Sequence, residues 1–114
     1  MSIDINVEKK EKYSIVKVSG KVDATTSGEL ENTLVDIIEN QESKIVLDLN
    51  DVTYISSAGL RVLVVITKQL LNSGYFFCSI SDNVKEIVQM AGFHTFMNIF
   101  DDIDAAIKAM EEAV

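Results

Sequence analysis

Hydrophobic and polar residues alternate with a period of two at the start of the chain. Residues 3–8 read Ile-Asp-Ile-Asn-Val-Glu, which predicts a strand with one solvated face. The charged run at residues 8–12 suits an exposed hairpin loop. Residues 13–19 are rich in β-branched side chains and predict a second strand that ends at Gly20. Because the connection is short, we expect these two strands to be antiparallel.

The hydrophobic spacing then changes to that of a helix. Thr26 and Glu29 have the spacing of a capping box, and an apolar stripe continues to Ile38, so a helix is predicted that ends at residues 40–41. Residues 44–49 predict a central strand covered on both faces, followed by a short polar loop. The next helix should run from about residue 57 to 72. One expected face comprises Leu60, Leu63, Val64, Thr67 and Leu71, and because Val62, Val65 and Ile66 fall elsewhere, the helix should be buried on more than one side.

The last third of the chain repeats this alternation. Residues 75–80 predict a strand, and Ser81 or Asp82 is placed to cap a short helix that Gly92 ends. Residues 97–100 predict a short last strand. Asp101 and Asp102 then open a final helix, where their charge complements the positive end. The apolar stripe expected on this helix is Ile103, Ala106, Ile107 and Met110.

The order of these elements predicts the fold class. Strands that alternate with helices indicate an α/β fold with right-handed crossovers. We therefore expect one domain over residues 1–114, a length that buries roughly two thirds of the unfolded surface. It should contain a mixed, mostly parallel sheet of four to five strands and about four helices, with the first strand antiparallel at the edge.

Composition and charge narrow the range of partners. The net charge is −8, and an acidic chain repels phosphate backbones and anionic headgroups, so we expect neither a nucleic-acid nor a membrane partner. A basic patch on a partner protein fits this charge, although the charge can equally serve solubility alone. No basic segment precedes an apolar stretch at the N-terminus, and the apolar runs are short, which predicts a cytoplasmic location.

Cysteine and histidine give no basis for a metal or a cofactor. Cys78 is the only cysteine and lies in the apolar run 75–78, where a buried structural thiol is expected. His94 is the only histidine and has no cysteine or carboxylate at ligand spacing. We therefore predict no metal site and no bound cofactor. A monomer is expected because the sequence shows no obvious exposed apolar stripe.

The segment from Asp48 to Arg61 carries the candidate chemistry. A buried strand, a polar stretch and two serines lead into a long helix, and sites in parallel sheets gather where strands end and helices begin. A phosphate on a serine at that helix start would be tolerated by the unpaired amides and would add about −1.5 to −2 charges. The alternative is that the two serines only cap the helix, and that Gly59 only permits close packing.

Two motifs in the sequence resemble the signature of the STAS domain. The first is the segment 54–61, Tyr-Ile-Ser-Ser-Ala-Gly-Leu-Arg, which follows Leu47-Asp48-Leu49 and Val52. The second is Gly20-Lys21-Val22-Asp23 after the second strand. The resemblance covers essentially the whole chain. It implies a STAS-like fold and, for a single domain of this size, the role of an anti-sigma factor antagonist (anti-anti-sigma factor).

The resemblance also implies a partner-switching cycle. An anti-sigma factor that is a serine kinase binds the unphosphorylated antagonist, phosphorylates the serine two positions before the motif glycine, and is released. That serine is Ser57 here, and a PP2C-type phosphatase would reverse the reaction. Many phosphorylated members have Asp where this chain has Ser56, so Ser56 is the alternative site. The residues expected at the partner surface are Asp23, Thr25, Thr26, Ser56, Ser57, Gly59 and Arg61, with a turn or a cap as the alternative role of Asp23 and the two threonines.

Three other functions compete with this one. A serine hydrolase needs a base and an oxyanion hole, yet Ser57 lacks a nucleophile elbow and only His94 could act as base. A phospho-aspartate receiver needs an acidic pair after its first strand, where this chain has a lysine-rich loop. We therefore predict that the chain is not an enzyme. A STAS accessory subunit that binds a lipid-transport ATPase, or a motility or biofilm regulator, remains the alternative function.

Overall fold

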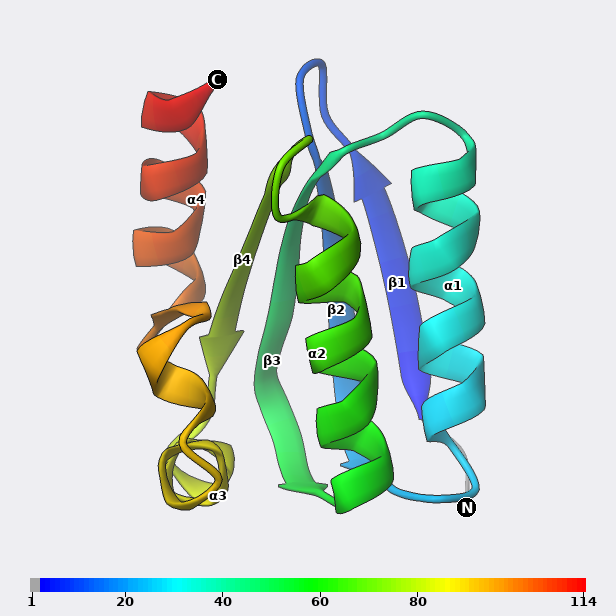
Figure 1. Ribbon diagram of the computed structural model, residues 1–114, viewed down its shortest axis with the longest axis vertical. Helices are drawn as coiled ribbons and strands as arrows, with labels where there is room; N and C mark the ends of the chain where they lie inside the picture. Colours follow the sequence, from blue (N-terminus) through cyan, green and yellow to red (C-terminus); the bar gives the residue numbers. More distant parts are fainter. Residues whose placement is uncertain (1–2) are drawn as a thin grey trace.

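The chain folds into alternating strands and helices arranged around one sheet (Figure 1). The computed structural model describes residues 3–114. The elements in chain order are β1 (Asp4–Lys9), β2 (Ser14–Val22), α1 (Ser27–Glu39), β3 (Lys44–Ile55), α2 (Ser57–Leu70), β4 (Tyr75–Ile80), α3 (Asp82–Met90), the 3₁₀ turn η1 (Phe93–Thr95), β5 (Asn98–Phe100) and α4 (Ile103–Ala113).

The five strands lie in the sheet in the same order as in the sequence. β1 pairs antiparallel with β2 at one edge, and β2, β3, β4 and β5 are all parallel to one another. The predicted fold class, including the antiparallel edge strand, is confirmed. The parallel strands all end at the same edge of the sheet, and each is followed by a helix. The N-termini of α1, α2, α3 and α4 therefore lie at that edge.

Two strands extend farther than predicted. β2 continues past Gly20 to Val22, and β3 continues past Leu49 to Ile55, so the loop expected after residue 49 is wrong. Only Lys44–Leu49 of β3 pairs with β4, whereas the remainder of β3 pairs with β2 alone. Gly20 has a φ of 106° beside a shift in register, which lets the paired strands continue. β2 and β3 therefore project beyond β4 as a two-stranded ribbon.

Each face of the sheet is covered by its own hydrophobic core. α1, α2 and α3 pack on one face, and the largest fully buried side chains of that core are Leu30, Leu34, Ile45, Leu47, Leu49, Ile55, Leu63 and Ile66. α4 packs on the other face, where its predicted stripe contacts Tyr13, Ile15, Val46 and Phe77. Cys78 is completely buried in the first core, and this burial raises the pKa of its thiol. No helix among residues 3–114 is long and apolar enough to cross a membrane.

α2 is buried on more than one side, as the positions of Val62 and Ile66 predicted, but its predicted end and the burial of Leu71 are wrong. The helix ends at Leu70, so Leu71 falls beyond it and is 68% exposed. The buried residues of the helix are Gly59, Leu60, Val62, Leu63, Ile66 and Leu70. Because α2 lies over the ribbon of β2 and β3, its glycine takes part in the packing. The first turn of α2 is thereby fixed against the end of the sheet.

Candidate functional site

The predicted site residues meet at the tip of the ribbon formed by β2 and β3. Val22 and Ile55 are the last paired residues of these strands. Beyond them the Ser56 amide donates a hydrogen bond of 2.8 Å to the carbonyl of Val22. Asp23 and Ser57 are the next residues along the two chain segments. In Figure 1 this junction lies where the arrow of β3 leads into α2.

The two serines have different positions in the helix start. Ser56 is the N-cap of α2: its backbone is extended, and its Oγ accepts a hydrogen bond of 3.4 Å from the Gly59 amide. Ser57 is the first residue of the helix and is exposed to solvent. Since amides in the first turn have no partner within the helix, the N-terminus favours negative charge. Ser56 thus stabilises the helix, and Ser57 presents its hydroxyl to solvent.

Gly59 lets the helix approach the ribbon closely. A Cβ atom at this position would lie 2.6 Å from Cγ1 of Ile55 and 2.8 Å from Cγ1 of Val22. Both neighbours are buried core residues with branched side chains. The glycine therefore has a packing role, as the alternative interpretation expected, and this packing sets the position of the serines.

Asp23 organises the turn between β2 and α1. Its Oδ1 accepts hydrogen bonds from the Thr25 amide at 2.9 Å, the Thr25 hydroxyl at 2.7 Å and the Thr26 amide at 3.2 Å. These bonds, that of the Thr25 hydroxyl first, lower the pKa of the Asp23 carboxyl. The carboxylate is thus charged at neutral pH and holds Thr25 on the exposed side of the turn.

The predicted capping box of α1 is wrong. Thr26 occupies the N-cap position, but its hydroxyl makes no cap hydrogen bond. Instead it donates to the carbonyl of Lys21 at 2.8 Å and accepts from the Asp23 amide at 2.9 Å. Thr26 is consequently buried and fastens the turn to the end of β2. It therefore presents little surface to a partner.

Arg61 connects the two helices that flank the site. Its Nη2 donates to Oε1 of Glu31 on α1 at 2.7 Å, and the Arg61 side chain is 61% exposed. Glu31 was not predicted as a site residue, because the two residues are 30 positions apart and only the packing of α1 beside α2 brings them together. Tyr54 is exposed, but as the neighbour of Ile55 in β3 it faces the opposite side of the ribbon from the Ile55 side chain that packs under α2.

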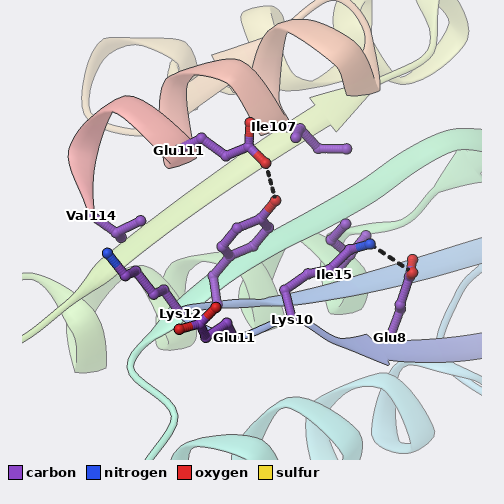
Figure 2. A pocket seen from close by; sticks show the side chains of 9 residues that line it. Glu8, Lys10, Glu11, Lys12, Ile15, Ile107, Glu111 and Val114 are labelled. Atoms are coloured by element: carbon purple, nitrogen blue, oxygen red, sulfur yellow. Dashed lines mark hydrogen bonds and ion pairs between the residues drawn. The ribbon is translucent and has the colours of Figure 1, made fainter.

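A hollow that none of these residues lines lies elsewhere on the molecule. It has a volume of about 490 Å³ and lies between the β1–β2 hairpin and α4, as Figure 2 shows. Its walls carry both charges, from Lys10, Lys12, Glu8 and Glu111, and none of the predicted site residues lines it. His94, the one candidate base, lies in η1 and lines a small pocket together with Lys85 and Asp101. Among residues 3–114 no group of three or more His, Cys, Asp or Glu side chains could hold a metal ion.

Known proteins resemble this chain in sequence and in fold. The family model of the STAS domain matches residues 4–106. A protein of Bordetella bronchiseptica named as an anti-sigma factor antagonist, BtrV, is 30% identical over 112 residues, which cover 96% of this chain and 97% of that protein. The anti-sigma-B factor antagonist of Staphylococcus aureus is 27% identical over 101 residues, which cover 87% of this chain and 94% of that protein.

A solved structure shows the same architecture. The crystal structure of an anti-sigma factor antagonist from Mycobacterium paratuberculosis superposes with a TM-score of 0.89 at 24% identity, over 96% of this chain and 94% of that one. At this identity the likeness establishes the fold. Together with the match of the family model over most of the chain, it confirms the resemblance found in the two motifs. The chain belongs to the STAS-domain family.

Proposed function

We propose that this protein is an anti-sigma factor antagonist, which binds an anti-sigma factor that is also a serine kinase. In the proposed partner-switching cycle, the unphosphorylated protein binds the anti-sigma factor and thereby frees the sigma factor. Phosphorylation of Ser57 ends the binding, and a PP2C-type phosphatase restores it. The proposal is supported by two relatives that carry this name and align with most of the chain.

The observation that carries the proposal is the exposed hydroxyl of Ser57 in the first turn of α2. The neighbouring Ser56 caps the helix, so Ser57 is free of that task. A phosphate adds about −1.5 to −2 charges, and the amides at a helix N-terminus tolerate them. The modification therefore changes the surface that a partner meets and leaves the packing beneath it intact.

The proposed partner surface surrounds this hydroxyl. The ends of the adjacent strands β2 and β3 contribute Asp23, Thr25, Ser56 and Ser57. Gly59 sets the distance between α2 and these strands, and Arg61 lies one turn farther along α2. A surface of this kind suits a folded protein partner.

The proposed compartment follows from the partner. Sigma factors act with RNA polymerase, so an antagonist of their inhibitor must work in the bacterial cytoplasm. The net charge of −8 disfavours direct binding to DNA or to anionic lipid, which leaves a protein as the partner.

Phosphate mapping tests the site. The protein is incubated with its cognate kinase and ATP, and the modified residue is located by mass spectrometry. We expect one phosphate on Ser57, none on the Ser57→Ala variant, and an unchanged yield on Ser56→Ala. A phosphate on Ser56, or none, would overturn the assignment.

Binding assays test the switch. Ser57→Ala should bind the anti-sigma factor in the presence of ATP without being released, because it cannot be modified. Ser57→Asp should bind at least tenfold more weakly than the wild type, since a fixed charge faces a surface shaped for a hydroxyl. If the unmodified protein binds no anti-sigma kinase but is purified with a transport ATPase, the accessory-subunit function is favoured instead.

A further inference from the structure

We propose that Arg61 is the intramolecular partner of a phosphate on Ser57, and that phosphorylation transfers Arg61 from Glu31 on α1 to residue 57 on its own helix. The inference rests on the function proposed above and adds a rearrangement of charge across the two helices. Arg61 is the only arginine in the sequence. Its place in the fold gives it one partner in each phosphorylation state.

Helix geometry places Arg61 within reach of residue 57. The two residues are four positions apart in α2, so their Cβ atoms lie about 5–6 Å apart on one face. Side chains of a helix lean toward its N-terminus, which directs the Arg61 side chain toward Ser57. The residues at contact spacing from Ser57 on the C-terminal side are Leu60 and Arg61, so Arg61 supplies the only cation there.

The ion pair that now holds Arg61 is exposed and therefore exchangeable. Arg61 Nη2 and Glu31 Oε1 are 2.7 Å apart, with the arginine side chain 61% and the glutamate side chain 26% exposed. Exposed pairs of this type contribute little to stability. A phosphate carries up to twice the charge of a carboxylate and accepts two parallel hydrogen bonds from a guanidinium. It should compete effectively with Glu31 for the same side chain.

The transfer changes two places on the proposed partner surface. In the unmodified protein the charges of Arg61 and Glu31 offset each other between α1 and α2. After transfer the guanidinium lies against the phosphate, and the Glu31 carboxylate is left without this cation. A partner would then meet new negative charge on both helices while the backbone stays in place.

The same geometry distinguishes the two serines. Ser56 precedes Arg61 by five positions, which turns it about 140° around the helix axis from Arg61. Its Oγ is also directed at the Gly59 amide as the helix cap. A phosphate on Ser56 would therefore be poorly placed for Arg61. Ser56 thus provides an internal control.

Nuclear magnetic resonance of the single arginine gives the first test. Phosphoserine is incorporated genetically at position 57, or at position 56 as the matched control, so that no kinase is needed. The Nε–H resonance of Arg61 should shift strongly with phosphoserine at 57 and little with phosphoserine at 56. An unmoved resonance in the position-57 protein would overturn the proposal.

A phosphorus titration of the position-57 protein gives the second test. Arg61 favours the dianion, so Arg61→Ala should decrease the second proton-dissociation constant of the phosphate about threefold. Glu31→Gln removes the competitor and should leave that constant equal or larger. Lys68→Ala removes a cation from the far end of α2 and should leave it unchanged. Equal constants for the wild type and Arg61→Ala would contradict the transfer.

These tests separate the inference from the proposed function. If the cognate kinase fails to modify Ser57, the proposed function fails, whatever the incorporated phosphoserine does. If the kinase modifies Ser57 but Arg61 does not respond, the switch stands and the transfer of Arg61 is wrong.

Discussion

The two ends of the sheet differ in how they are built. At the end where β2 and β3 stop, hydrogen bonds and close packing fix every segment: the Val22–Ser56 bond, the turn around Asp23 and the contact of Gly59. At the opposite end the β1–β2 hairpin and α4 enclose an open hollow of about 490 Å³. Side chains of both charges line it, and the Tyr13 hydroxyl donates a hydrogen bond of 2.9 Å to Glu111 of α4 across the gap.

Under the proposed function, the serine end and not the hollow is the functional end. Small ligands need concave, largely apolar sites with a few convergent polar groups, whereas folded proteins dock on broad, gently shaped surfaces. At the serine end the exposed side chains stand on segments that hydrogen bonds and close packing hold in place. Changes at that end should therefore alter partner binding, and changes at the hollow should alter only stability.

The largest effect is expected from Gly59→Ala. The new methyl group would meet Ile55 and Val22 at 2.6 and 2.8 Å, and these buried side chains cannot move without disturbing the core. We expect a loss of roughly 1–3 kcal/mol in the free energy of unfolding, measured by urea denaturation, together with weaker binding to the anti-sigma factor.

Gly28→Ala is the matched control for this substitution. A Cβ at Gly28 has no atom within 4 Å, so the same change should raise stability slightly, by about 0.5 kcal/mol, through helix propensity. Equal stability of the two variants would show that the close approach of α2 does not hold the serine end in place.

The next largest effect is expected from Ser56→Ala, which should cost more stability than Ser57→Ala. Ser56→Ala removes the acceptor of the Gly59 amide and should cost about 1 kcal/mol of unfolding free energy. Ser57→Ala removes an exposed hydroxyl and should stay within about 0.5 kcal/mol of the wild type. Thermal denaturation of both variants measures the difference. The reverse order would mean that Ser57, and not Ser56, maintains the helix start.

Tyr13→Phe probes the opposite end. Burial, followed by the hydrogen bond to Glu111, raises the pKa of the Tyr13 hydroxyl. Because Glu111 itself is exposed, the loss of this bond should cost only about 0.5 kcal/mol. Urea denaturation measures this cost, and calorimetric titration with the anti-sigma factor should give an unchanged affinity. A tenfold loss of affinity would place partner contacts at the hollow.

The smallest effect is expected from Asp23→Asn and depends on pH. The hydroxyl and amide of Thr25 lower the pKa of the folded carboxyl, so its stabilisation is complete above the unfolded value of about 3.9 and is lost as the pH falls through the folded value. The urea midpoint of the variant should therefore lie below that of the wild type at pH 7, and the two should converge near about pH 2. A constant difference at both pH values would exclude this titration as the cause.

The sequence was sufficient to predict the fold and the order of its elements. Alternating residues predicted the edge strand β1, and the helical stripe of α4 matched its buried residues. The motif also placed Ser56 and Ser57 correctly at the start of α2. These features depend on neighbours in the chain, which a local pattern can represent.

What could not be predicted depends on residues far apart in the sequence. Asn50 and Asp51 have loop character, yet both lie in β3. The Asn50 amide group donates to the carbonyls of Ile80 and Asp101, and Asp51 pairs with Lys17 at 3.4 Å. The ion pair of Arg61 with Glu31 on the neighbouring helix could not be predicted from local patterns either. Such long-range partners exist only once the sheet and its helices have assembled.

The most direct measurement compares binding and stability in one pair of samples. The protein with serine and the protein with phosphoserine at position 57 are titrated with the anti-sigma factor and then unfolded by urea. We predict that the phosphate weakens binding at least tenfold and changes the unfolding free energy by less than about 1 kcal/mol, since the charge lies on an exposed helix start. Equal affinities, or a phosphorylated protein that loses its fold, would contradict this account.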